Sequence, residues 1–188
     1  LSSGLLYRYI SYKLISKKKL FNKNEYVKKI AKNITLKKLK NRKLFSQTVV
    51  QYASEIAKSK KIRIQLKKYQ KNFANQNHVC IEGRDIASVI CPGADIKLFF
   101  KCNLTVRAKR RWKEYKKYNS KITLAEVKKA LKIRDYSDIN RKHSPLRLTK
   151  DSIVIDTSKL NKMQTLSKIS KIVEKKLLLK YGRDFKAR

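Results

Sequence analysis

Apolar residues recur every three to four positions over much of the first half of the chain, which is the spacing of one helix face. This spacing predicts a largely apolar helix from Ser2 to about Ile15 and further helices over Val27–Ile34 and Phe45–Phe73. Polar breaks at 22–24 and 40–43 separate these stretches. The first half is therefore expected to be mainly helical.

The second half of the chain contains three short apolar runs, at His78–Glu82, Asp95–Phe100 and Ser152–Asp156. They lack a clean period of two, which is typical of parallel strands covered on both faces. Helical patterns at 104–118, 124–133 and 163–179 lie between and after them. This alternation predicts an α/β fold, with a parallel sheet flanked by helices and right-handed crossovers.

Two of these helices carry end signals. Thr123 is followed three residues later by Glu126, which is the spacing of a capping box. Gly182 lies just beyond the last apolar stripe and is expected to end that helix.

The composition fits one globular domain with an unusual charge. The 188 residues are 41% hydrophobic and contain no apolar stretch long enough to cross a membrane. The 50 Lys and Arg against 13 Asp and Glu give a net charge of +37, as in many nucleic-acid-binding proteins. Most of these cations are Lys scattered along the chain, which is also typical of a solvated surface.

The cysteines indicate neither a disulfide framework nor a structural zinc site. Cys80, Cys91 and Cys102 form no CxxC pair, and the chain has only two His. We expect free thiols in a reducing cytoplasm and no metal-ligating residues.

Three segments carry candidate chemistry, each with an ordinary alternative. Gly83-Arg84-Asp85 follows a predicted strand, where open α/β sheets bind ligands, or it forms a salt bridge at a turn. Arg134, Asp138 and Arg141 would share one helix face, either around an anion with adjacent hydroxyls or as an exposed ion-pair ladder. The cluster Arg107, Arg110 and Arg111 suits an anion, a nucleic acid or a solvated face.

Taken in order, these and weaker segments resemble bacterial cytidylate kinase over nearly the whole chain. The matching segments are Ser3–Arg8, Ala53–Arg63, Gly83–Ile86, Pro92–Phe100, Arg107–Arg111, Arg134–Leu146 and Ile155–Ser158. The resemblance implies a nucleoside monophosphate kinase with the P-loop kinase fold. It would transfer the γ-phosphoryl group of ATP, with Mg²⁺, to CMP or dCMP, giving CDP or dCDP. A single kinase domain would then comprise a core helix (1–20), the monophosphate-binding lobe (21–77), core (78–106), lid (107–121) and core (122–188).

The resemblance also implies roles for individual residues. Arg8, Arg84 and Arg141 would hold the acceptor phosphate, and Arg141 would also act in catalysis. Ser54, Arg63 and Asp85 would read the cytosine edge. Further residues would surround them: Arg134 and Asp138 at the sugar, Tyr7 lining the pocket, Ser3 beside it, and the catalytic lid residues Arg110 and Arg111, with Arg107 as a further lid member.

The donor side of such a kinase is missing from the sequence. The only glycines are Gly4, Gly83, Gly93 and Gly182, so no GxxxxGK[ST] phosphate loop is present. We expect the first strand and this loop to precede Leu1, and a natural loss of the donor site is the alternative. The chain as given is expected to be unstable at its sheet edges and to show little kinase activity.

A second departure lies between Arg8 and Ala53, where the family often carries a small inserted sheet. Here the stretch is short, rich in Lys and helical in pattern, so the insert is expected to be reduced or lost. Two rival functions stay open: a basic nucleic-acid-binding protein with steeply salt-dependent affinity, and a remnant that binds nothing. For the kinase we expect a monomer that contacts nucleic acid only non-specifically.

Overall fold

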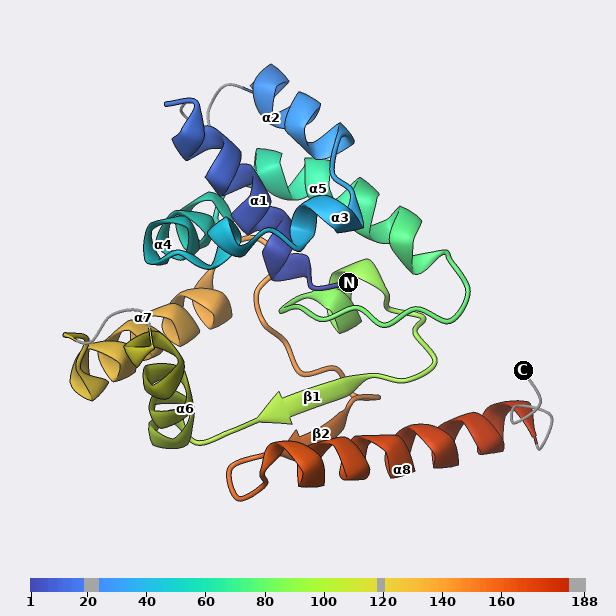
Figure 1. The fold of residues 1–188 in the computed structure, drawn as a ribbon. Helices are drawn as coiled ribbons and strands as arrows, with labels where there is room; N and C mark the ends of the chain where they lie inside the picture. Colours follow the sequence, from blue (N-terminus) through green and yellow to red (C-terminus); the bar gives the residue numbers. More distant parts are fainter. Residues whose placement is uncertain (19–23, 118–120, 183–188) are drawn as a thin grey trace. The chain divides into compact units, whose positions relative to one another are not determined.

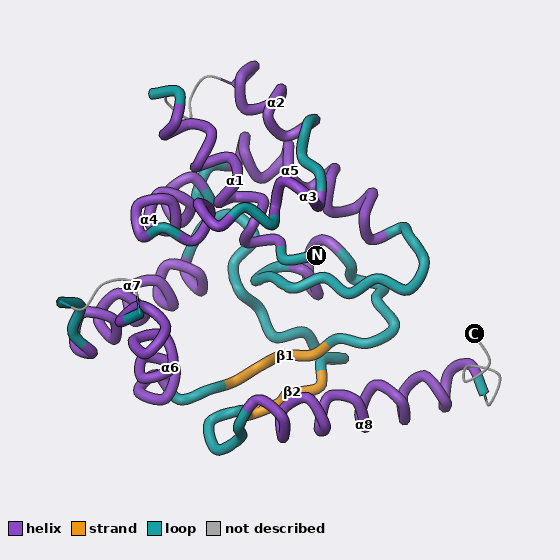
Figure 2. Tube along the Cα trace, viewed as in Figure 1, coloured by secondary structure: helices purple, strands orange, loops and turns teal. Residues whose placement is uncertain are grey.

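The computed structural model describes residues 1–18, 24–117 and 121–182 (Figure 1). Its helices and strands, coloured by type in Figure 2, follow one another as α1 (Ser3–Ser16), α2 (Asn24–Lys32), α3 (Leu36–Leu39), η1 (Arg42–Phe45), α4 (Gln47–Ile56), α5 (Lys60–Ala74), η2 (Ile86–Ile90), β1 (Leu98–Lys101), α6 (Leu104–Lys116), α7 (Leu124–Asn140), β2 (Ile153–Asp156) and α8 (Lys162–Tyr181). The chain forms two compact units. Unit 1 comprises Leu1–Gly93 and Tyr136–Arg147, and unit 2 comprises Ala94–Asp135 and Leu148–Arg188.

Unit 1 is built around α1. Leu6, Ile10 and Leu14 recur at helical spacing on one face of α1, and each is 0% exposed. This face packs against α4, η1, α2 and α3, while α2 packs against α5. The result is one continuous apolar core made of helix faces, as the spacing of apolar residues in the first half predicts.

The predicted helix over Phe45–Phe73 is two helices with a break between them. Ser59 interrupts the pattern, and its Oγ accepts a hydrogen bond from Ile62 N at the start of α5. A serine in extended conformation competes with the backbone for hydrogen bonds, so it begins a helix more readily than it continues one. Between Arg8 and Ala53 the described residues contain helices and no strand, as the sequence predicts for a reduced insert.

The prediction of a strand at His78–Glu82 is wrong. His78 has a φ of 54°, outside the β region, and only Glu82 forms a bridge, a parallel one with Ser2. Leu1 N donates to Cys80 O at 2.6 Å, and Glu82 N donates to Leu1 O at 2.9 Å. A single bridge between Glu82 and Ser2 is too short to form a β-ladder. The segment therefore contains no strand.

Unit 2 contains the sheet, in which β1 and β2 pair in parallel with Leu98 opposite Ile153. The other two predicted strands are thus confirmed. Strand β1 begins three residues later than predicted and ends one residue later, and β2 begins one residue later and ends at the predicted residue. The capping box is also confirmed, because Thr123 N donates to Glu126 Oε2 at 2.8 Å and Glu126 N donates to Thr123 Oγ1 at 3.2 Å. Helix α7 continues past the predicted end at Ile133 to Asn140.

The last helix, α8, begins with its own capping box, Asn161 and Gln164, and ends at Gly182, whose φ is +71°. Its apolar stripe is present, but no residue of α8 is buried. Leu166 is 56% exposed and Leu179 is 74% exposed. None of the described helices combines the length and the apolar character that a membrane crossing needs.

Candidate functional site

The candidate site begins at the turn Gly83-Arg84-Asp85 in unit 1. The extended segment before it is tied to the start of α1, since Ser3 N donates to Glu82 O at 2.9 Å. A Cβ on Gly83 would lie 2.2 Å from Ser3 Oγ and 2.9 Å from Ile86 Cγ1. Only glycine allows Ser3 to approach this closely, so Gly83 sets the distance between α1 and the turn.

Asp85 and Arg63 form the most buried ion pair of the site. Arg63 NH2 donates to Asp85 Oδ2 at 2.5 Å, and each side chain is 9% exposed. Arg63 NH1 also donates to Ala57 O at 3.1 Å, but its buried Nε–H has no hydrogen-bond partner among the described residues. A buried guanidinium donor without an acceptor is costly, so this atom fits a ligand that brings an acceptor.

Two features help to hold this pair in place. Tyr7 lies beneath Arg63, whose guanidinium carbon is 5.6 Å from the ring centroid. Burial raises the pKa of Tyr7 to about 12, so the hydroxyl stays protonated and neutral. Asp85 also precedes η2, a single π-helical turn in which Ile90 N donates to Asp85 O at 3.2 Å.

Asp138 joins two further arginines. Its Oδ2 accepts from Arg84 Nε at 2.9 Å and its Oδ1 accepts from Arg141 NH1 at 3.2 Å. Arg141 lies just beyond the end of α7, and its Nε donates to Ser144 O at 2.7 Å. Of the three residues predicted to share one helix face, Arg134 and Asp138 lie in α7, whereas Arg141 lies just beyond its end. Asp138 pairs with Arg141 as expected, and Arg84 from the glycine turn joins them.

The electrostatics of the group favour an anion. Burial lowers the pKa of Arg141, and the positive charge of Arg63 lowers it further, while Asp138 opposes both effects. The group contains three guanidinium groups, from Arg63, Arg84 and Arg141, against the two carboxylates Asp85 and Asp138. The excess of one positive charge favours an anionic ligand.

Two further predicted site residues of unit 1 come from α1 and α4. Arg8, in the second turn of α1, is stacked on Phe45 of η1, with its guanidinium carbon 5.3 Å from the ring centroid. Ser54 is half-buried in α4 and has no hydrogen-bond partner among the described residues. Its hydroxyl can therefore bind a ligand without first breaking a contact.

The remaining predicted site residues belong to unit 2, within α6 and α7. Arg107 forms a two-point ion pair with Asp135, at 2.9 and 2.6 Å. Arg110 NH2 donates to Thr157 O and Leu160 O, each at 2.8 Å. Arg111 pairs with Glu114 at 3.0 Å. Arg134 is half-buried, one turn before Asp138 in α7.

Sequence reasoning missed three partners of these residues. It named neither Phe45 beneath Arg8, nor Asp135 paired with Arg107, nor the Arg63–Asp85 contact itself. The position of Phe45, an apolar residue inside a Lys-rich polar stretch, could have indicated a special role for it. The Arg107–Asp135 and Arg63–Asp85 pairs join residues that are distant in sequence, so the spacing of residues could not predict them.

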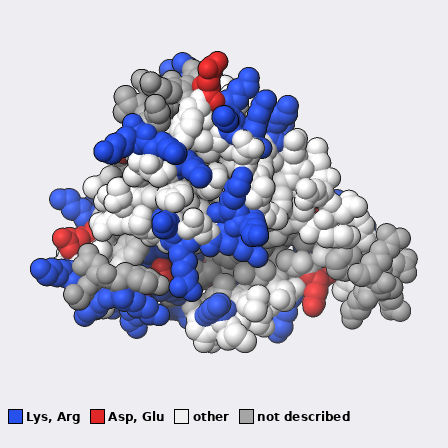
Figure 3. Space-filling model, turned by 45° about the horizontal axis from the view of Figure 1, so that its top comes forward, with Lys and Arg blue, Asp and Glu red and all other residues white. Residues whose placement is uncertain are grey.

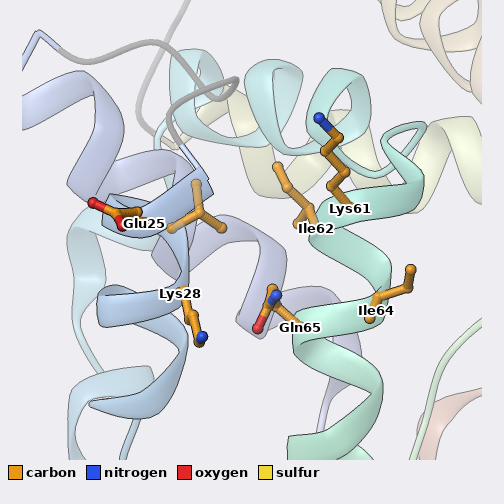
Figure 4. Close-up of a pocket in the computed structure, with 7 residues that line it drawn as sticks. Glu25, Lys28, Lys61, Ile62, Ile64 and Gln65 are labelled. Atoms are coloured by element: carbon orange, nitrogen blue, oxygen red, sulfur yellow. The ribbon is translucent and has the colours of Figure 1, made fainter.

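A separate hollow of about 350 Å³ lies between α2 and α5 (Figure 4). Its lining residues are Glu25, Val27, Lys28, Lys61, Ile62, Ile64 and Gln65. None of the predicted site residues lines it, so it is distinct from the group around Asp85. Lys28 and Lys61 belong to the many exposed cations, which outnumber the acidic residues on the face drawn in Figure 3.

Comparison with known proteins gives one family. The model of the family described as cytidylate kinase matches residues 1–175. A cytidylate kinase of Fusobacterium nucleatum is 32% identical over 185 residues, covering 93% of this chain and 85% of the relative. One of Rickettsia rickettsii is 32% identical over 176 residues, covering 93% and 80%. One of Bartonella henselae is 35% identical over 162 residues, covering 86% and 75%.

Proposed function

Because the chain belongs to the cytidylate kinase family, we propose that the group around Asp85 in unit 1 binds CMP or dCMP as the acceptor in transfer of the ATP γ-phosphoryl group. The products are then CDP or dCDP. The observation that carries the proposal is the buried Arg63–Asp85 pair with an unused guanidinium donor, beside Asp138 and two further arginines.

The buried pair is suited to the cytosine edge. Asp85 Oδ1, which takes no part in the contact with Arg63, accepts from the exocyclic N4 amino group, and Arg63 Nε–H donates to a ring acceptor. Uracil has a carbonyl in place of that amino group and would face Asp85 with like partial charge. Sites that depend on such hydrogen bonds reject the wrong partner by roughly 10⁴-fold. Ser54 supplies a further hydroxyl to the same edge.

The arginines are suited to the phosphate. Arg84 and Arg141 are held by the same carboxylate, which orients both guanidinium groups before a ligand arrives. Arg8 completes the phosphate side, and Arg141 also stabilises charge on the transferred group. Asp138 and Arg134 contact the sugar, with Tyr7 and Ser3 around the pocket.

The donor side is not supplied by the residues in hand. The sequence contains no GxxxxGK[ST] loop, and no cluster of three His, Cys, Asp or Glu suited to a metal ion occurs among the described residues. ATP and Mg²⁺ are proposed as the donor and its ion. Arg110 and Arg111 are proposed to close over the phosphates as a lid and exclude water. The 188 residues alone should turn over little CMP in a coupled ATP-consumption assay.

Calorimetric titration tests the acceptor site without requiring the donor. Wild-type chain should bind CMP and bind UMP far more weakly. Asp85→Ala should raise the Kd for CMP by about 10- to 100-fold, because a charged hydrogen bond is lost and Arg63 is left unpaired. Lys67→Ala, an exposed residue of α5, is the matched control and should change little. Equal binding of CMP and UMP, or no binding by the wild type, would overturn the proposal.

The high charge supports a second, weaker interaction. We propose that the chain also binds nucleic acids non-specifically through its net charge of +37, with an affinity that falls steeply with salt. Binding of an arbitrary single-stranded RNA should therefore vanish at a salt concentration that leaves CMP binding measurable. We further propose that the chain acts as a cytoplasmic monomer.

A further inference from the structure

Phe45 occupies an unusual place for a phenylalanine. It is the last residue of η1 and is 55% exposed, whereas its neighbour Leu44 is 0% exposed in the core of unit 1. A large apolar ring gains little from water contact, and burying it would be favourable. The exposure alone is ordinary, so the contact on its face decides its meaning.

That contact is Arg8. Its guanidinium carbon is 5.3 Å from the Phe45 ring centroid, within the range of an attractive cation–π interaction. Arg8 directly follows Tyr7, whose ring carries Arg63 at 5.6 Å. Two adjacent residues of α1 therefore take part in two cation–aromatic contacts. One involves Arg63, which the proposed function assigns to the base, and the other involves Arg8, which it assigns to the phosphate.

The turn η1, which carries Phe45, is anchored in unit 1. Leu44 anchors η1 in the core, and η1 packs against α1 and α4. Asn41 Oδ1 accepts from Lys43 N at 2.9 Å, which caps the turn before Phe45. The ring is thus presented from a short, anchored turn, and an arginine side chain loses many rotamers when it is fixed in one position.

We propose that Phe45 is a positioning residue for phosphate binding, which acts by holding the Arg8 guanidinium in place through its ring face. This inference rests on the proposed CMP site. The ring makes no contact with the nucleotide itself. The ring lowers the conformational entropy that the Arg8 side chain loses when the phosphate binds. Replacing Phe45 should therefore weaken binding of the phosphate and leave recognition of the base unchanged.

The test compares a ligand that has the phosphate with one that lacks it. Calorimetric titration with CMP and with cytidine is carried out on wild type, Phe45→Ala, Phe45→Leu and Phe45→Tyr. Phe45→Ala and Phe45→Leu should raise the Kd for CMP about two- to fivefold, since a partly exposed cation–π contact is lost, and leave cytidine binding unchanged. Phe45→Tyr keeps a ring and should retain wild-type affinity for CMP.

Two controls separate positioning from folding. Leu36→Ala removes another exposed apolar side chain of the same lobe, 52% exposed, and should alter neither titration. In an Arg8→Ala background, Phe45→Ala should have no additional effect on CMP binding. Equal weakening of CMP and cytidine binding, or undiminished CMP binding by Phe45→Leu, would overturn the inference. A wild type that binds no CMP would instead overturn the proposed function.

Discussion

The two units differ in how much of their apolar surface they bury. Unit 1 has a continuous core around α1, in which Leu6, Ile10 and Leu14 are fully buried. In unit 2 the buried apolar residues among those described are Ala108, Val127 and Ile155, while Phe100 and Val154 of the sheet are 51% and 42% exposed. The predicted acceptor-binding side chains that contact one another are in unit 1. A well-packed core holds side chains in fixed positions, so this unit can assemble a binding site before its ligand arrives.

The largest expected effect lies at the buried ion pair of unit 1. Asp85→Ala should lower the free energy of unfolding by about 3–5 kcal/mol, because it leaves the Arg63 charge buried without its partner. Glu55→Ala breaks the exposed pair with Lys58 and should change stability by less than about 1 kcal/mol. Urea denaturation of both variants provides the measurement, and equal effects would contradict the burial difference.

Core truncation compares the two units directly. Ile10→Ala in α1 should lower the free energy of unfolding by about 2–5 kcal/mol, as for other fully buried aliphatic side chains. Leu166→Ala in α8, where the side chain is 56% exposed, should lower it by less than about 1 kcal/mol. A large loss from Leu166→Ala in chemical denaturation would show that α8 is packed in solution.

Substitutions at two glycines test whether the close packing of Gly83 against Ser3 matters for stability. Gly83→Ala should lower the free energy of unfolding by about 1–3 kcal/mol, because the new methyl group would lie 2.2 Å from Ser3 Oγ. A Cβ on Gly93 would have no heavy atom within 4 Å, so Gly93→Ala should change the free energy of unfolding by less than about 0.5 kcal/mol. Thermal denaturation monitored by circular dichroism distinguishes these outcomes, and identical melting temperatures would show that the turn relaxes freely.

Acid should weaken unit 2 through several small effects. Hydrogen bonds from Lys180, Lys97 and Ser158 lower the pKa values of Asp95, Asp151 and Asp156, respectively. A lowered folded-state pKa stabilises the fold above the ordinary value near 4, and this stabilisation is lost as the pH falls below it. The effect is small because the carboxylates are exposed.

The only tryptophan, Trp112, lies in α6 of unit 2, and its indole Nε1 donates to Ile122 O at 2.9 Å. Its fluorescence can therefore follow this unit. The melting temperature it reports should fall between about pH 6 and pH 3, and Asp151→Asn should reduce that dependence. A transition unaffected by acid in the wild type would contradict the assigned pKa shifts.

The sequence predicted local features better than contacts between distant segments. Thr123 with Glu126 and the stop at Gly182 were predictable because capping depends on residues a few positions apart. The strand at His78–Glu82 was predicted wrongly, since an apolar run shows nothing about whether a partner strand lies beside it. The site residues were named from ordered resemblance to a family. Their pairing, as in Asp138 with both Arg84 and Arg141, depends on the folded core and has no signature in spacing.

A crystal structure of this chain with CMP would show whether the residues of unit 1 bind the nucleotide as proposed. We expect the phosphate to lie within hydrogen-bond distance of Arg8, Arg84 and Arg141, and the N4 amino group of cytosine to donate to Asp85. A nucleotide bound elsewhere, or those arginines directed to separate surfaces in the presence of CMP, would contradict it.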